Sequence, residues 1–152
     1  MPKKELKVIG WREWIAFPKL GIKKVKAKVD SGARTSSLHA FDVSLFKRKG
    51  QQYVRFLVHP HQRNSKEELE CTSKVLEFRK VKSSNGQSEL RPVILTPIQL
   101  LGETFEAEVT LTNRDEMGFR MLLGRESIRK RFLIDTGKSF LGGPAKKKVT
   151  KK

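Results

Sequence analysis

Asp30 is the residue whose type and setting most directly suggest chemistry in this 152-residue chain. It ends a run in which apolar and basic residues alternate, and Ser31 and Gly32 follow it at once. Alternation indicates a half-buried strand, and Ser with Gly is typical of a tight turn. The pattern therefore predicts a carboxylate at a strand end, in a turn where glycine lets the backbone approach closely. Taken alone, the same run is also typical of an ordinary turn.

The strand that presents Asp30 is predicted over residues 22–29, with Val25, Ala27 and Val29 on one face and lysines on the other. Further strands are predicted over residues 38–46, 51–58, 71–81, 91–100, 104–112 and 119–123, and one helix over 125–132. An acid in the first turn and bases in the last suit the dipole of this helix. Many short strands with regularly spaced turns predict an all-β fold, a small closed β-barrel with one late helix.

A second short motif, Leu122-Leu123-Gly124-Arg125, stands at the head of the predicted helix. The run Val29–Ala33 resembles the Asp-Thr/Ser-Gly-Ala turn of aspartic proteases, and the second motif resembles the other signature of their retroviral branch. More of the chain is similar to a bacterial family labelled ATP-dependent zinc proteases. That resemblance covers most of residues 8–141 and is carried by Lys28–Leu38, Ser83–Pro92 and, most specifically, Thr110–Arg125.

The resemblance implies a single-lobe, retropepsin-like barrel of the acid protease type over residues 1–143. The lysine-rich composition of residues 144–152 predicts a basic, disordered tail. The resemblance also implies a peptidase that hydrolyses peptide or protein substrates through Asp30. Aspartic peptidases use two carboxylates that share one proton. A single lobe supplies only one, so the resemblance implies a homodimer with a second Asp30 across a two-fold axis. The residues that would support the catalytic carboxylate are Ser31, Gly32, Ala33, Gly124 and Arg125.

Ser31 and Gly32 would hold the carboxylates through a hydroxyl group and a backbone N–H group. The candidate flap over the substrate is a hairpin whose tip contains Ser84, Asn85 and Gly86. Asn followed by Gly is a strong signal for a tight hairpin turn.

Arg34 departs from the retroviral pattern, in which the residue after the alanine is often acidic and pairs with the Gly-Arg arginine. Arg34 and Arg125 cannot pair with each other, so we expect them to use other acceptors, such as Glu126. A second run of the same kind, Asp135-Thr136-Gly137, lies near the end of the chain. Too little sequence follows it to build a second lobe, so we assign it to a C-terminal turn.

The zinc and ATP in the family label correspond to no ligand motif in the sequence. Gly137-Lys138-Ser139 resembles the end of a phosphate loop, but Phe132 stands where that loop needs a glycine. The sequence has no His-Glu-x-x-His motif, and no standard zinc site matches the spacing of His39, His59, His61 and Cys71. We therefore predict no metal and no cofactor.

Net charge is the most pronounced global feature, because 33 Lys and Arg against 16 Asp and Glu give +17. This balance suits an acidic partner or nucleic acid, and the scarcity of interleaved aromatic residues predicts that any nucleic-acid contact is nonspecific. The alternative to a peptidase is a catalytically silent module that binds a peptide or an acidic partner on the same barrel. A single cysteine, no signal peptide and no long apolar run predict a cytoplasmic protein without membrane contact.

Overall fold

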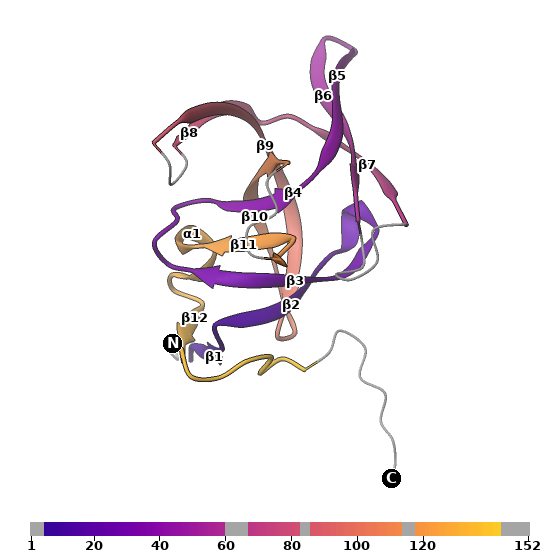
Figure 1. Ribbon diagram of the computed structural model, residues 1–152. Helices are drawn as coiled ribbons and strands as arrows, with labels where there is room; N and C mark the ends of the chain where they lie inside the picture. Colours follow the sequence, from indigo (N-terminus) through magenta and orange to yellow (C-terminus); the bar gives the residue numbers. More distant parts are fainter. Residues whose placement is uncertain (1–4, 60–66, 83–85, 114–117, 144–152) are drawn as a thin grey trace, which may run out of the picture.

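The computed structural model describes residues 5–59, 67–82, 86–113 and 118–143, and strands dominate it (Figure 1). The strands are β1 (Lys7–Ile9), β2 (Arg12–Phe17), β3 (Ile22–Asp30), β4 (Ser36–His39), β5 (Phe41–Arg48), β6 (Gln51–Val58), β7 (Leu69–Lys74), β8 (Glu77–Lys82), β9 (Ser88–Leu100), β10 (Glu103–Thr112), β11 (Met121–Gly124) and β12 (Phe132–Ile134). A short 3-10 helix, η1 (Pro18–Leu20), and an α-helix, α1 (Arg125–Ile128), accompany them. The prediction of an all-β fold with one late helix is confirmed.

The main sheet contains seven strands in the order β10-β4-β11-β3-β2-β9-β8. Strand β9 is 13 residues long, so its first part pairs with β8 and its second part pairs with β10. The β10–β9 pairing joins the two sides of the sheet, so that β10, β4, β11, β3, β2 and β9 follow one another in a ring. Within this ring β4 runs parallel to β10, and β11 runs parallel to β3.

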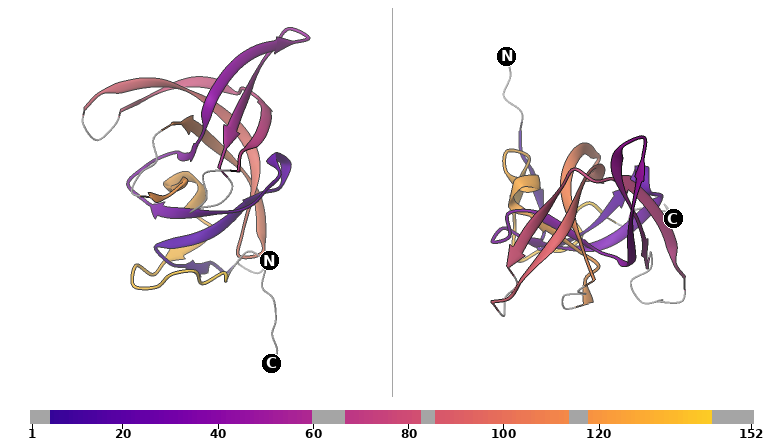
Figure 2. Two further views of the ribbon diagram at one scale, coloured as in Figure 1. Left: turned by 45° about the vertical axis from the view of Figure 1, so that its right-hand side comes forward. Right: turned by 90° about the horizontal axis from the view of Figure 1, so that it is seen from above.

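Two smaller sheets flank the ring. Strands β5, β6 and β7 form an antiparallel sheet, and its β5–β6 hairpin projects away from the rest of the molecule (Figures 1 and 2). Strands β1 and β12 pair in parallel and bring the two ends of the domain together. The segment after β12 is bonded to β2, because Trp11 N–H donates to Lys138 O at 2.8 Å and Phe140 N–H donates to Arg12 O at 2.9 Å.

The alternation of apolar and polar residues along the strands fills one core inside the ring. In β3, Val25 and Ala27 are buried, and Lys24 on the opposite face is exposed. Removing such side chains from water is the main favourable contribution to folding. The largest fully buried apolar side chains are Ile9, Ile15, Phe17, Leu38, Val54, Phe56, Ile94, Ile98, Leu100, Met121 and Leu123.

Two predicted strands are each split between sheets. The predicted strand 71–81 is β7 and β8, because Val75 N–H donates to Gln52 O in β6 whereas Leu76 N–H donates to Val93 O in β9. The predicted strand 38–46 is likewise divided into β4 and β5, which belong to different sheets. In both cases the backbone remains extended while its hydrogen-bonding partner changes, and sequence alternation does not register that change.

The predicted helix over residues 125–132 is wrong in length, because α1 ends at Ile128. Arg129 has an extended ψ of 139°, and Phe132 is buried in β12. The tail predicted over residues 144–152 lies outside the described residues. Among the residues that are described, none belongs to a helix with the length and apolar character needed to cross a membrane.

Candidate active site

The Asp30 turn and the Gly124 motif meet because β3 and β11 run side by side in parallel. Their register places Gly124 next to Asp30 at the ends of the two strands. Gly32 N–H donates to Asp30 Oδ1 at 3.0 Å, which orients the carboxylate. The side chain of Asp30 is partly exposed, so solvent and ligands can reach it. The two sequence motifs are therefore parts of one site.

The first turn of α1 is bonded to the loop that follows Asp30. The N–H groups of Arg125 and Glu126 donate to the carbonyl oxygens of Ala33 at 2.7 Å and Arg34 at 3.1 Å. The Arg125 guanidinium donates from Nη1 to Ser31 O at 3.0 Å. Backbone and side chain of the Gly-Arg motif thus fix the turn that carries the carboxylate.

Two details differ from the sequence-based expectations. Glu126 is not the acceptor for Arg125, because its Oε1 accepts a hydrogen bond from Arg129 at 3.5 Å while Arg125 uses the Ser31 carbonyl. Within the described residues, Ser31 contributes that carbonyl oxygen to the hydrogen bonds of the site and not its hydroxyl group.

Gly124 is required because backbone passes directly over it. A Cβ atom at this position would lie 2.6 Å from Thr35 C and 2.8 Å from Thr35 O. The N–H of Gly124 donates to the hydroxyl oxygen of Ser36 at 2.9 Å, and this hydroxyl lies 3.3 Å from Ser127 Oγ. Ser36 and Ser127 are buried and were not predicted as site residues. Their only sequence signal was their polarity at positions where strand and helix face the core.

A groove of about 560 Å³ opens over the Asp30 turn. Its floor is one face of the sheet, since the strand register aligns Leu122 with Ser37, and Ser37 with Thr110. The floor therefore combines hydroxyl groups and apolar surface beside one carboxylate. The described residues that line it are Asp30, Gly32, Ala33, Arg34, Thr35, Ser37, His39, Arg79, Lys80, Val81, Lys82, Arg91, Thr110, Thr112, Phe119, Arg120, Met121 and Leu122.

The β8–β9 hairpin forms the opposite wall of the groove and arches over the side of the sheet that contains β4 (Figure 1). Arg79 and Val81 from β8 and Arg91 from β9 line the groove. This hairpin is the one predicted as the flap. At its tip, Ser84 and Asn85 lie outside the described residues, and Gly86 has a φ of +88°, which favours glycine.

Two arginines of the hairpin are fixed by carboxylates, and one of them, Arg91, forms a salt bridge with Glu89 at 2.7 Å. Arg79 forms salt bridges with Glu77 and with Glu108, the latter at 3.0 Å, and it donates to Thr35 Oγ1 at 3.3 Å. Hydrogen bonding to Glu77 is the largest cause that raises the pKa of the Arg79 guanidinium. Arg79 therefore ties the hairpin to the strand that follows the Asp30 turn.

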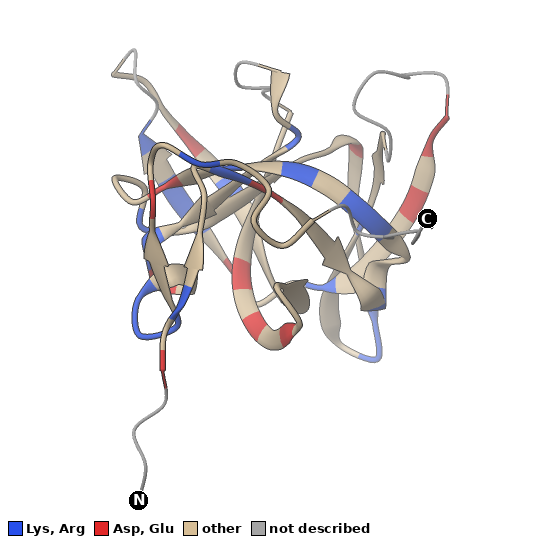
Figure 3. Cartoon of the chain, turned by 90° about the horizontal axis from the view of Figure 1, so that it is seen from below, with Lys and Arg blue, Asp and Glu red and all other residues tan. Residues whose placement is uncertain are grey.

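Three other cations in the groove are not neutralised in this way. Within the part of the chain that the structure describes, the side chains of Arg34, Lys80 and Lys82 line the groove and form no salt bridge. Asp30 is the one carboxylate among the described residues of the lining. The groove is thus positively charged, as is the chain as a whole, where Lys and Arg outnumber Asp and Glu (Figure 3).

The described side chains do not fit a zinc site. No group of three or more His, Cys, Asp or Glu side chains among them could hold a metal ion. Burial, with a smaller effect from Glu70, raises the pKa of the Cys71 thiol to about 11, whereas zinc binds a thiolate. His59 contacts Glu67 O through Nδ1 at 3.1 Å, and His61 lies outside the described residues.

The described residues do not form a phosphate loop either. Gly137–Ser139 precedes no helix, and Lys138 O accepts the N–H of Trp11.

Comparison with known proteins identifies a family that this chain matches. A family model described as RimB-like, a retropepsin-like aspartic endopeptidase, matches residues 8–144. A protein of Shewanella pealeana named "Probable alpha-L-glutamate ligase" is 54% identical over 136 residues, which cover 90% of this chain and 30% of the relative. A protein of the same name from Desulfotalea psychrophila is 49% identical, over 85% of this chain and 28% of the relative. This chain thus spans about 30% of the length of the curated relatives that it matches.

A crystal structure has the same architecture. The protein Lpg0085 of Legionella pneumophila, whose title gives its function as unknown, superposes with a TM-score of 0.76 at 27% identity. The match covers 91% of this chain and 99% of the Legionella chain.

Proposed function

Because this chain belongs to the RimB-like family of retropepsin-like aspartic endopeptidases, we propose that it hydrolyses peptide bonds with two Asp30 carboxylates, one from each subunit of a homodimer. One observation carries the proposal: Asp30 stands at the end of β3 in the groove, with its carboxylate oriented by Gly32 N–H. We interpret the ring of six strands as the single-lobe barrel of this class. We place the activity in the cytoplasm, since a single buried thiol fits a reducing compartment.

The proposed mechanism uses the two carboxylates in different protonation states. The ionised Asp30 accepts a proton from a water molecule whose oxygen attacks the carbonyl carbon of the substrate. The protonated Asp30 of the other subunit donates a hydrogen bond to the carbonyl oxygen, where negative charge develops. Collapse of the tetrahedral intermediate breaks the C–N bond, and a proton passes to the leaving amine. Two adjacent ionised carboxylates would repel each other, so the pair holds one proton between them.

The homodimer follows from the number of carboxylates. Asp30 is alone among the described residues that line the groove, and an aspartic dyad needs two such groups within hydrogen-bond reach. A two-fold axis beside the Asp30 turn would supply the second from an identical chain. Arg125 and Gly124 fix the same turn in each copy, so both carboxylates would be held equally.

We further propose that the substrate is rich in glutamate. Arg34, Lys80 and Lys82 line the groove without carboxylate partners among the described residues, which makes the groove complementary to acidic side chains. The curated relatives are named as glutamate ligases, and they contain a segment similar to this chain. A peptidase acting on glutamate-rich peptides would hydrolyse bonds of the chemical kind that a ligase for α-linked glutamate forms.

The test is incubation of the purified protein with a glutamate-rich peptide and with its glutamine counterpart, with the products identified by mass spectrometry. We expect cleavage of the glutamate-rich peptide by the wild type and none by Asp30→Asn. Asn keeps an oxygen that can accept the Gly32 N–H bond but cannot act as an acid or a base. Equal cleavage by a folded Asp30→Asn protein would contradict the mechanism, and equal cleavage of both peptides would contradict the substrate class.

The second candidate function is a catalytically silent module that holds an acidic peptide in the same groove. It is favoured by the relatives, in which a segment like this chain makes up about 30% of a protein named as a ligase. Sedimentation at working concentrations separates the two functions. A monomer that binds the glutamate-rich peptide without cleaving it would support the module, since a single Asp30 cannot form the dyad.

A further inference from the structure

A basic face of β2 and β3 lies beside the groove. In β3, Val25 and Ala27 point into the core, so Lys24, Lys26 and Lys28 share the opposite face with Asp30, which lines the groove. The antiparallel register places Arg12 of β2 beside Lys28. We call Arg12, Lys24, Lys26 and Lys28 the basic ridge.

Aromatic rings contact three of the four cations of the basic ridge. Lys24 Nζ lies 4.8 Å from the ring centroid of Trp14, and Lys26 Nζ lies 5.1 Å from that of Phe119. The Arg12 guanidinium lies 4.6 Å from the Trp11 ring and 5.0 Å from the Phe140 ring, and its Nε donates to Ser139 Oγ at 3.1 Å. These contacts fix the positions of the charges by cation–π attraction, which does not neutralise them.

Carboxylates among the described residues do not compensate the charge of Arg12, Lys24 and Lys26. Among the described residues, Arg12, Lys24 and Lys26 form no salt bridge, in contrast to Arg79 and Arg91 of the β8–β9 hairpin. An anion that binds these three cations would therefore displace no carboxylate of the described residues. Cations that are already ordered also cost less conformational entropy on binding than free lysines do.

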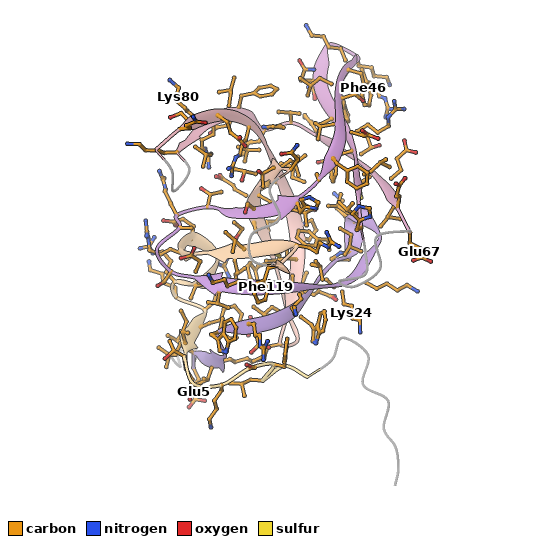
Figure 4. The ribbon with its side chains drawn as sticks, in the orientation of Figure 1. Glu5, Lys24, Phe46, Glu67, Lys80 and Phe119 are labelled. Atoms are coloured by element: carbon orange, nitrogen blue, oxygen red, sulfur yellow. The ribbon has the colours of Figure 1, made fainter. Side chains whose placement is uncertain are left out.

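Phe119 connects the basic ridge to the groove. Phe119 lines the groove, and its ring makes the cation–π contact with Lys26. The same ring packs edge-to-face against Trp11 at a centroid distance of 6.0 Å. Figure 4 shows that Phe119 and Lys24 lie along β3, the strand that ends at Asp30. A chain that leaves the groove over Phe119 reaches the ridge directly.

We propose that the basic ridge is an exosite that binds the acidic extension of a peptide whose scissile bond lies in the groove. Lysines at alternate positions of β3 recur about every 6.5–7 Å, and so do alternate side chains of an extended peptide. A glutamate-rich extension lying along β3 therefore presents one carboxylate to Lys24 and one to Lys26. The inference rests on the proposed function for the position of the scissile bond, but binding at the ridge can be measured separately.

The ring contacts favour an acidic peptide over single-stranded nucleic acid. Bases need open aromatic faces on which to stack. Trp14 and Phe140 stack on each other at 5.4 Å, and each also carries a cation. Little ring surface is left for a base, whereas the ammonium groups of Lys24 and Lys26 can still contact carboxylates.

The test compares a short glutamate-rich substrate with the same substrate extended by further glutamates. In Lys24→Gln/Lys26→Gln, we expect KM for the extended peptide to rise about tenfold, because each exposed ion pair contributes up to about 1 kcal/mol. The kcat and the KM of the short peptide should stay unchanged. Added salt should remove the advantage of the extended peptide in the wild type. The matched control is Lys47→Gln/Lys74→Gln, which removes the same charge from the β5–β6–β7 sheet and should behave as wild type.

A direct binding measurement keeps this inference independent of peptidase activity. Trp11 and Trp14 contact cations of the basic ridge, so their fluorescence should change when a polyglutamate peptide binds. The double variant Lys24→Gln/Lys26→Gln should weaken that binding about tenfold. An equal loss in the Lys47→Gln/Lys74→Gln control would overturn the exosite and indicate a general charge effect. Stronger competition by a single-stranded oligonucleotide than by polyglutamate of equal charge would overturn the peptide assignment. Absence of cleavage with intact ridge binding would contradict only the proposed peptidase.

Discussion

The chain contains two Asp-x-Gly turns with the same local geometry and different surroundings. Gly32 N–H donates to Asp30 Oδ1 at 3.0 Å, and Gly137 N–H donates to Asp135 Oδ1 at 3.0 Å. Asp30 lies at the end of β3 in the groove, beside Gly124. Asp135 follows β12 and does not line the groove.

The difference shows that the turn presents a carboxylate but does not by itself make a site. At Asp30, parallel pairing with β11, the N–H groups of α1 and the Arg125 guanidinium all fix the turn within the groove. At Asp135, the backbone hydrogen bonds connect the segment after β12 to β1, since Asp135 N–H donates to Ile9 O at 2.8 Å. The first turn lies in the groove that we propose as the ligand site, and the second fastens the C-terminal segment to the N-terminal strands.

The largest expected difference between the turns is in catalysis. We expect Asp30→Asn to lower kcat/KM for a glutamate-rich peptide by about a thousandfold, within the range for loss of a positioned acid or base. Asp135→Asn should leave kcat/KM within about twofold of wild type, as for a surface change away from special features. In both variants the amide oxygen can still accept the glycine N–H, so only the charge and the proton are removed. Comparable losses in the two variants would show that the turns act alike.

The glycines that support each turn provide the second comparison. A Cβ at Gly124 would lie 2.6 Å from Thr35 C, and a Cβ at Gly10 would lie 2.1 Å from Lys138 O. Either alanine substitution must displace backbone, so we expect each to lower the free energy of unfolding by about 1–3 kcal/mol. Gly124→Ala should also lower the kcat/KM of the folded protein, because the displaced backbone adjoins Asp30.

Gly10→Ala is the matched control for that measurement. Its strain falls on the segment after Asp135, so the folded fraction should keep the wild-type kcat/KM. Denaturant unfolding and initial rates, both measured well below the transition midpoint, separate the two effects. A Gly10→Ala protein with wild-type stability, or with a changed kcat/KM, would contradict the division of roles between the two turns.

The sequence was sufficient to identify both Asp-x-Gly turns, and the choice of Asp30 as the catalytic one stays a prediction. Alternation along β3 predicted the strand that ends at Asp30, and the Gly-Arg motif predicted a second element at the same site. Their contact could not be deduced from alternation, because it depends on parallel pairing between strands that are far apart in the chain. The buried Ser36–Gly124 hydrogen bond was missed for the same reason, since Ser36 in its own sequence context is one polar residue among several.

Local sequence patterns also could not predict where some strands begin and end, or where the helix ends. An extended run such as residues 71–81 changes partner sheets at Val75 without any change in hydrophobic period. Basic residues in the last turn of the predicted helix suggested that the helix continued to Phe132. Burial of the Phe132 side chain in β12 takes precedence over helix propensity.

Glu13 provides a smaller test on the side of the second turn. Its buried carboxylate accepts three backbone N–H groups, from Gly10 at 2.7 Å, Leu141 at 2.9 Å and Gly142 at 3.1 Å. Glu13→Gln places an amide NH2 group against these donors, so we expect the free energy of unfolding to fall by about 1–3 kcal/mol. The kcat/KM of the folded protein should not change. A loss of activity without loss of stability would mean that the C-terminal segment contributes to the groove.

The smallest expected effect is at the serine pair behind Gly124. Ser36 Oγ accepts the Gly124 N–H at 2.9 Å, and Ser127 Oγ lies 3.3 Å from the same oxygen. Ser36→Ala leaves a buried N–H without its acceptor, so we expect a loss of about 1–2 kcal/mol of stability and a measurable fall in kcat/KM. Ser127→Ala leaves the Gly124 bond in place and should cost less than about 1 kcal/mol. Because the two serines share one hydrogen bond, the double variant should cost less than the sum of the single ones. Strict additivity in denaturant unfolding would show that the pair does not act as a unit, and Ser36 would then support Gly124 independently of Ser127.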